Sequence, residues 1–287
     1  MCSSDLNQVT MTSGVTNCVI SASQSGNATT ASASPITKTI TATLMAQPML
    51  DVSASALNLT FNPITPEQVT VTATGGAGTG TLRYSLRAGD NCSISVAGDV
   101  ATVTINGAGV CRVSAQRVAD ANYLASNVAS VDISVARALG FITIGTPPGT
   151  VTFGGDVTPP VAGINSVAAL RYSSSNPQVV DVDPVTGQLT INGVGTATIT
   201  ISASASANFT APDPVTYVVT VDPASPAAPQ NVRTSLNGNS IRVTWDAPTF
   251  TGGTPLQKYV ASASAGTQSL TCEAVADRKS TRLNSSH

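Results

Sequence analysis

The chain has 287 residues, of which 10% are charged and 4% are aromatic, and its formal net charge is −2. The single histidine is His287, so a Ser-His-Asp triad or a multi-histidine metal site has no residues to be built from. The charge balance provides no basic stripe, which argues against a nucleic-acid partner. Because the polar residues are mostly hydroxyls, the composition indicates an extracellular or cell-surface all-β protein. The catalytic constellations in the sequence are weak, so we expect neither an enzyme nor a cofactor.

Both ends of the sequence differ from the rest. Residues 1–6 (MCSSDL) lack the segments of a signal peptide, and the single residue before Cys2 is too short for a lipoprotein signal. Residues 1–6 and 277–287 (DRKSTRLNSSH) resemble translated sequencing-adapter read-through, and a genuine polar tail is the alternative for the latter. We expect the signal and the anchor to lie outside this sequence, which has no apolar run long enough for a membrane span.

Three short motifs recur at nearly constant spacing. Residues 82–85 (LRYS) recur 88 residues later, and residues 104–109 (TINGAG) recur as TINGVG 86 residues later. Repetition at a fixed period indicates a duplicated domain. The third recurring motif pairs Asn122-Tyr123 with Asn208-Phe209, and a partial copy near the N-terminus contains Cys18 and Asn27.

Within each copy, apolar residues alternate with Thr or Ser. Residues 69–72, 100–105, 197–201 and 215–221 show the alternation, and Gly, Pro, Asn or Asp residues separate such runs. A period of two predicts half-buried strands of antiparallel sheets. No helical pattern longer than two turns is found, so the fold is predicted to be all-β.

Longer segments resemble known families. Residues 172–201 resemble a bacterial immunoglobulin-like domain, and the copy before them, with its GDNC and GVCRVSAQ segments, resembles cysteine-containing repeats of bacterial surface proteins. Residues 226–274 resemble a fibronectin type III domain through Trp245, the GGTPL loop and Tyr259. The resemblance implies tandem immunoglobulin-like antiparallel β-sandwiches. The strands that should follow Ala274 are missing, so the last module is expected to be unstable.

These observations predict a chain of five parts. The expected parts are the end of a truncated immunoglobulin-like repeat at 1–46, a disulfide-containing repeat at 47–136, a bacterial immunoglobulin-like repeat at 137–223, the start of a fibronectin type III domain at 224–276 and a tail at 277–287.

The cysteines provide the sharpest local prediction. Cys92 and Cys111 lie 19 residues apart around a predicted hairpin, and we expect them to form a disulfide between neighbouring strands. The equivalent positions of the next copy hold Val180 and Ala197, as expected if the two sites touch in the core. Two buried thiols are the alternative, and a zinc site would need more ligands. Cys18 and Cys272 are then expected to be orphans whose partners lie outside the sequence.

Other candidate sites are weaker. Asp181 and Asp183 could contribute to a calcium site, but an Asp-Pro-x-Thr-Gly stretch is more typical of a β-turn, and we expect no metal. Recurring aromatic residues could form a carbohydrate-stacking platform, although we expect them to be structural core. The expected core aromatic residues are Tyr84, Tyr123, Tyr172, Phe209, Trp245 and Tyr259.

Two functions remain open. The first is a set of non-catalytic structural or adhesive stalk modules of a bacterial extracellular or cell-surface protein. The alternative is a set of accessory modules of a secreted polysaccharide-degrading enzyme whose catalytic domain is absent. The expected partners are neighbouring β-sandwich domains of the same chain, with polysaccharide or a host surface protein bound through parts outside this sequence.

Overall fold

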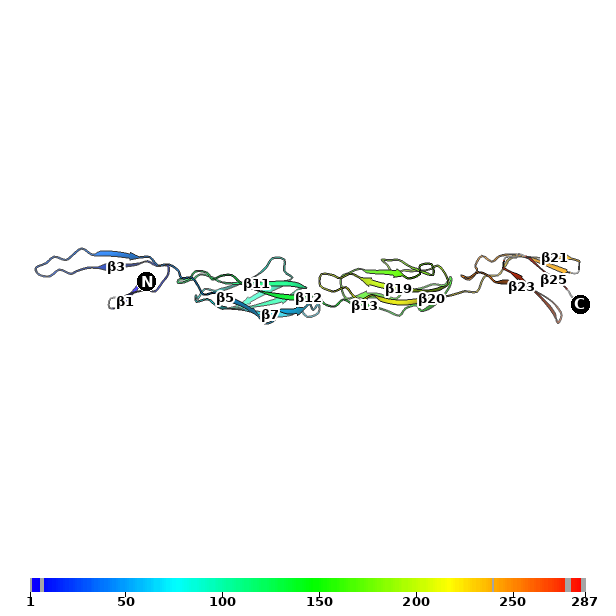
Figure 1. The fold of residues 1–287 in the computed structure, drawn as a ribbon, viewed down its shortest axis with the longest axis horizontal. Coiled ribbons are helices and arrows are strands. Elements are labelled where there is room, and N and C mark those ends of the chain that lie inside the picture. The colour runs from blue at the N-terminus through cyan, green and yellow to red at the C-terminus, as the bar shows by residue number, and fades with distance from the viewer. Residues whose placement is uncertain (1, 6–7, 239, 277–279, 285–287) are drawn as a thin grey trace. The chain divides into compact units, whose positions relative to one another are not determined.

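The computed structural model describes residues 2–5, 8–238, 240–276 and 280–284, and every helix or strand in this part of the chain is a β-strand. The predicted all-β fold is confirmed. The chain divides into two compact units, one made of Met1–Leu139 with Ala207–Thr210 and the other of Gly140–Ser206 with Ala211–His287. Figure 1 shows the strands along the chain from blue to red.

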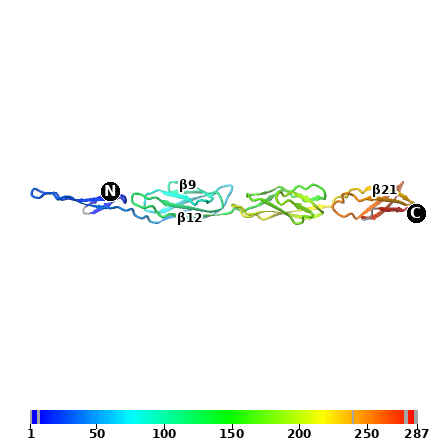
Figure 2. The same ribbon diagram turned by 90° about the horizontal axis from the view of Figure 1, so that it is seen from above.

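The first sandwich, residues 50–136, consists of two four-stranded sheets. One sheet has the order β5 (Leu50–Ala54), β7 (Gln68–Gly75), β10 (Val100–Ile105) and β9 (Cys92–Ala97). The other has the order β6 (Asn58–Thr60), β12 (Ala129–Ala136), β11 (Gly109–Arg117) and β8 (Leu82–Leu86). Figure 2 shows β9 and β12 on opposite sides of this sandwich. All pairs are antiparallel except β6 with β12, and the strand order is that of an immunoglobulin domain.

Alternation along the strands builds the core between these sheets. Val69 and Val71 of β7, Val103 of β10, Val113 of β11 and Ile133 of β12 are all almost fully buried. The Thr and Ser residues between them face outward, because successive side chains of a strand point to opposite faces. The hydroxyl-rich composition therefore covers the outer faces of an aliphatic core.

The second sandwich, residues 142–222, repeats the same strand order with one interruption. Its complete sheet has the order β14 (Thr150–Thr152), β20 (Val215–Asp222), β19 (Gly195–Ala203) and β16 (Leu170–Ser174). The opposite layer consists of two separate pairs, β13 (Ile142–Ile144) with β15 (Ala162–Ile164) and β17 (Val180–Val182) with β18 (Leu189–Ile191). Pro159 and Pro160 precede the short β15, from which only Val161 separates them. Because proline has no N–H to donate, this stretch cannot extend the pairing as β7 does.

The remaining strands lie on either side of these sandwiches in the sequence. Two hairpins precede them, β1 (Cys2–Asp5) with β2 (Gln8–Met11) and β3 (Cys18–Ala22) with β4 (Ile36–Ile40). After them, β21 (Gln230–Asn237), β22 (Ser240–Asp246) and β25 (Ser280–Asn284) form one sheet, and β23 (Lys258–Ala265) pairs with β24 (Gln268–Val275). One more strand thus follows Ala274 than the sequence analysis expected, and it lies in the predicted tail.

Candidate functional site

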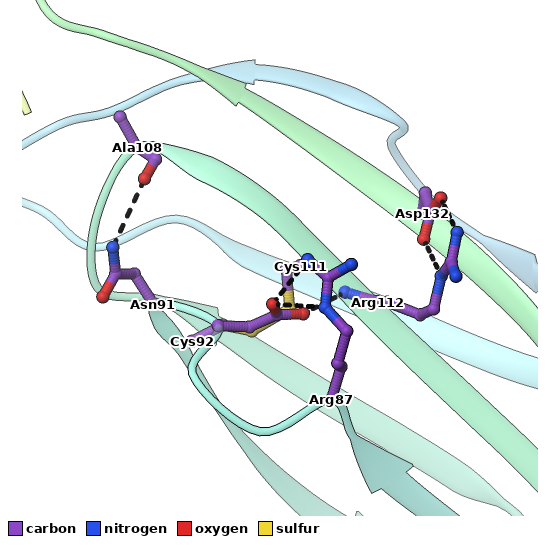
Figure 3. The surroundings of a disulfide bond; sticks show 8 residues. Arg87, Asn91, Cys92, Ala108, Cys111, Arg112 and Asp132 are labelled. Carbon is purple, nitrogen blue, oxygen red and sulfur yellow. Dashed lines mark hydrogen bonds and ion pairs between the residues drawn. A yellow bond between two sulfur atoms is a disulfide. The ribbon is translucent and has the colours of Figure 1, made fainter.

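The disulfide of the first sandwich joins its two sheets. Cys92 on β9 and Cys111 on β11 are bonded, with Cα atoms 6.2 Å apart (Figure 3). The predicted bridge between neighbouring strands is wrong in its location, because β9 and β11 belong to opposite sheets. After the β9–β10 hairpin, residues 106–108 carry the chain across to the other sheet. An interval of 19 residues is therefore enough to link the two layers.

A loop held by Asp90 leads into this disulfide. The side chain of Asp90 is only 4% exposed. It accepts hydrogen bonds from Arg87 Nε at 2.9 Å and from the backbone N–H of Arg112 at 2.7 Å. The Arg112 N–H, with the Arg87 guanidinium, holds the pKa of Asp90 below its ordinary value. These contacts attach the loop to β11 and place Cys92 beside Cys111.

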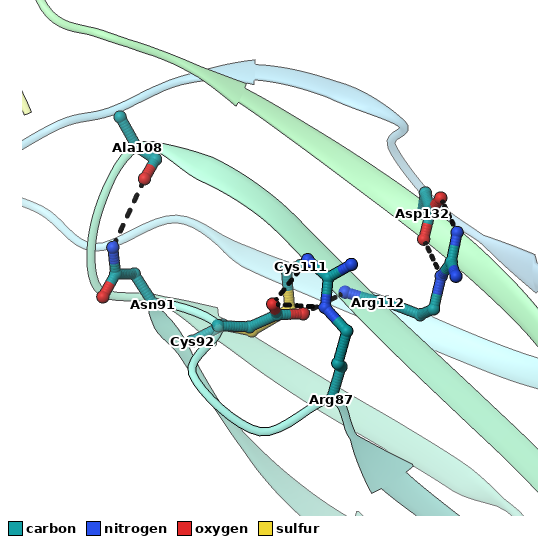
Figure 4. A network of polar contacts seen from close by, with 8 residues as sticks. Arg87, Asn91, Cys92, Ala108, Cys111, Arg112 and Asp132 are labelled. Atoms are coloured by element: carbon teal, nitrogen blue, oxygen red, sulfur yellow. Dashed lines mark hydrogen bonds and ion pairs between the residues drawn. A yellow bond between two sulfur atoms is a disulfide. The ribbon is translucent and has the colours of Figure 1, made fainter.

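Arg112 uses its side chain for a second contact. Its Nε and Nη2 atoms each donate to an oxygen of Asp132 at 2.6 Å, directly across the β11–β12 pair (Figure 4). Both side chains are exposed to more than 40%. Asp90 is not among the residues predicted from the sequence, where its only signal is a position two residues before Cys92 in a chain with 10% charged residues.

The three potential ligands at this place do not fit a metal ion. Among the described residues, Asp90, Cys92 and Cys111 are the only group of three His, Cys, Asp or Glu side chains whose ligand atoms all lie within 4.8 Å of one another. The two sulfur atoms are bonded to each other, so they offer no thiolate. The arrangement stabilises the sandwich and leaves a single carboxylate.

The remaining cysteines with described side chains differ from one another. Cys18 is disulfide-bonded, so the expectation that it is an orphan is wrong. It is also 2% exposed, and this burial fits a structural role. Cys272 on β24 is a thiol, with its Sγ 3.9 Å from the carbonyl oxygen of Glu273.

The candidate calcium ligands face their own backbone. Asp183 Oδ1 accepts hydrogen bonds from the N–H groups of Val185 at 3.0 Å and Thr186 at 2.6 Å, and from the Thr186 hydroxyl at 2.8 Å. These bonds, that of the Thr186 N–H first, lower the pKa of Asp183. Asp181 Oδ1 accepts from the N–H of Val182 at 2.9 Å. The geometry is that of a β-turn, the alternative given above.

The aromatic residues separate into two groups. Tyr84 on β8 and Tyr172 on β16 are half-buried and pack against the cores of their own sandwiches. Tyr123 and Phe209 lie in loops instead, and neither belongs to those cores. Phe209 is buried against Phe61, with ring centroids 6.1 Å apart. It contributes to the first unit, because residues 207–210 belong there, and not to the strands that flank it in the sequence.

Trp245 and Tyr259 line an apolar groove in the last module. Their ring centroids are 5.1 Å apart, and they lie on β22 and β23 of different sheets. The groove has a volume of about 500 Å³ and includes Pro226, Pro248 and Leu256. Trp245 is 6% exposed, and its Nε1 has no hydrogen-bond partner among the described residues.

Comparison with known proteins supports the immunoglobulin-like character of the second sandwich. Residues 166–205 match the family described as intimin, immunoglobulin-like domain. No curated protein matches the chain. None of the described residues form a helix long and apolar enough to cross a membrane.

The solved structures similar to this chain are distant from it in sequence. A crystal structure of titin domains is 16% identical over 83% of this chain and 88% of that chain, with a TM-score of 0.35. A C-terminal fragment of intimin, in complex with the intimin-binding domain of the translocated intimin receptor, is 18% identical over 60% of this chain and 63% of that chain, with a TM-score of 0.23. From its own strand topology, the chain is an all-β protein of tandem immunoglobulin-like antiparallel β-sandwiches.

Proposed function

We propose that this chain supplies non-catalytic structural or adhesive stalk modules to a bacterial extracellular or cell-surface protein. The observation that carries the proposal is the repetition of one immunoglobulin strand order in two successive sandwiches, each built around its own apolar core. Each such module adds length and outer surface to a chain without needing a reactive group. The family match at residues 166–205 supports the same role.

The disulfides support a location outside the cytosol. Cys92, Cys111 and Cys18 are all disulfide-bonded, and such bonds persist in oxidising surroundings outside the cytosol. The outer faces of the strands are rich in Thr and Ser, which favours exposure to solvent without a strong charge. We therefore place the chain outside the cell, with neighbouring β-sandwich domains as its first partners.

A binding and turnover assay of the full chain tests the proposal. Beads coated with the oxidised chain are presented to a panel of polysaccharides and host matrix proteins, and the same solutions are assayed for released sugar or peptide. Absence of binding supports a spacer, and binding to a host protein supports an adhesive stalk. Release of product would contradict the non-catalytic role, and binding restricted to polysaccharide would favour accessory modules of a polysaccharide-degrading enzyme.

A further inference from the structure

The loops that carry the recurring Asn-aromatic motif lie outside the two core clusters and have no part in the proposed function. The first loop, residues 120–124, and the second loop, residues 207–210, both belong to the first unit. In each loop the motif faces chain that precedes its own sandwich in the sequence. The first loop contacts residues 14 and 45, and the second contacts residues 108 and 138.

The backbone contacts of the two loops are the same. Met45 donates its N–H to the carbonyl of Asn122 at 2.9 Å, and its carbonyl accepts from Leu124 at 2.8 Å. Ala138 donates to the carbonyl of Asn208 at 2.9 Å, and its carbonyl accepts from Thr210 at 2.9 Å. Each loop therefore forms an isolated parallel bridge with one residue of the segment that enters its sandwich.

Each asparagine side chain adds a contact to a glycine turn, with the glycine itself as donor in the first loop and the residue after the glycine as donor in the second. Asn122 Oδ1 accepts from the N–H of Gly14 at 3.2 Å, and Asn208 Oδ1 accepts from the N–H of Ala108 at 2.9 Å. Gly14 lies four residues before Cys18, and Gly107 lies four residues before Cys111. The two acceptor loops thus meet corresponding turns of successive sequence copies.

Where the loops approach these turns, the two glycines leave little room for a side chain. A Cβ atom on Gly14 would lie 3.2 Å from the carbonyl oxygen of Ala121 and 3.3 Å from the Cα of Asn122. A Cβ atom on Gly107 would lie 2.9 Å from Asn208 Oδ1. The same residue type therefore leaves room for the same asparagine at both places.

We propose that the Asn-aromatic loop is a clasp by which each sequence copy binds the glycine turn and the connecting segment of the copy before it. The surface formed by Gly107, Ala108 and Ala138 fits one kind of partner, the Asn-aromatic loop of the next copy. Phe209 strengthens the second clasp by packing on Phe61, and Asp120 orders the first by accepting from the N–H groups of Asn122 and Tyr123. This inference holds for a spacer and an adhesin alike, so it does not rest on the proposed function.

Amide hydrogen exchange of the full chain, resolved by residue with NMR, tests the clasp. In Asn208→Ala, the Ala108 amide should exchange at least about fivefold faster, because its acceptor is lost. Asn208→Asp keeps the acceptor oxygen and should restore the slow exchange. Asn62→Ala is the matched control, because Asn62 Oδ1 caps only its own loop through Ile64 and Thr65. Amides of Ile133 and Ile199 in the cores should stay protected in all three variants.

The clasp is contradicted if Ala108 stays equally protected in Asn208→Ala, or if Asn208→Asp exchanges as fast as the alanine variant while the cores stay protected. Asn122→Ala provides a graded second measurement. Its effect on the Gly14 amide should be smaller, because Gly14 also donates to the carbonyl of Ala121 at 2.9 Å. An effect at Gly14 larger than the effect of Asn208→Ala at Ala108 would contradict the geometry assigned to the asparagines.

Discussion

The two sandwiches have the same strand order but close their cores by different means. The first has a continuous sheet from β5 to β9 and a disulfide from that sheet to β11. The second splits the corresponding layer into two pairs and places Val180 and Ala197 at the positions of the cysteines. Aliphatic packing and a covalent bridge are therefore alternative ways to hold the two layers of a sandwich together.

The largest change in the free energy of unfolding is expected from shortening a core side chain of the second sandwich. Ile199 on β19 is fully buried, and it corresponds to the fully buried Val113 on β11. Ile199→Ala should lower the free energy of unfolding by about 4 kcal/mol, because it leaves a cavity where no covalent bond restrains the layers. Calorimetry of the full chain measures the shift in the unfolding transition of the second sandwich. Ile133→Ala on β12 is the matched change in the bridged sandwich, because Ile133 is also fully buried, and an equal or larger loss there would contradict the comparison.

Replacing the bridge by the pair found in the second sandwich should have the next largest effect. Cys92→Val with Cys111→Ala copies Val180 and Ala197 into the first sandwich. The free energy of unfolding should fall by about 3 kcal/mol, because a loop of this length is no longer closed in the unfolded chain. Thermal unfolding with and without a reducing agent measures this loss of stability. Reduction of the native chain should lower its stability by a similar amount. An unchanged melting temperature in both cases would show that packing alone holds the layers.

The contacts of Asp90 should contribute less to the free energy of unfolding than the disulfide that follows them in the sequence. Asp90→Asn weakens the charge-assisted bonds from Arg87 and from the N–H of Arg112, with an expected loss of about 1 kcal/mol. Asp132→Asn is the matched control, because that ion pair with Arg112 is exposed to solvent and should contribute less to stability than the contacts of Asp90. Denaturant titration of both variants compares them. A larger loss in the Asp132 variant would contradict the role of burial.

The smallest effect is a pH dependence of the first sandwich. The N–H groups of Asn122, Thr79 and Tyr123 lower the pKa of Asp120 to about 2, from an ordinary value of 3.8. A lowered folded-state pKa means that the stabilisation is present above the ordinary pKa and is lost as the pH falls from about 4 to about 2. Melting temperatures measured across this interval should therefore fall more steeply for the native chain than for Asp120→Asn. Parallel slopes would show that the carboxylate contributes nothing.

The strands were the part most readily predicted from the sequence, because alternation such as that of residues 100–105 depends on local pleating alone. The separation of β15 from β18 could have been anticipated from Pro159 and Pro160, whose missing N–H groups are visible in the sequence. The burial of Asp90 could not, because it depends on the backbone of Arg112 in another strand.

The location of the bridge, which was predicted wrongly, and the surroundings of the recurring aromatic residues both depend on long-range placement. A spacing of 19 residues between Cys92 and Cys111 says nothing about which sheet each strand joins. Tyr123 and Phe209 occupy the same position in their two copies. Such a recurrence is expected for a residue of the core, and equally for a residue that contacts another sequence copy. Three-dimensional contacts were needed to distinguish them.

The bridge between β9 and β11 also sets how much chain the first sandwich can release under tension. If a pulling force unfolds it, the 19-residue interval closed by Cys92 and Cys111 stays looped and cannot be drawn out. At about 3.4 Å per extended residue, this withholds roughly 65 Å of contour length. The second sandwich has no bond at the corresponding positions, so it would yield its full length. The two sandwiches would therefore act as a short and a long extensible element in series, and reduction of the bridge would make them nearly equal.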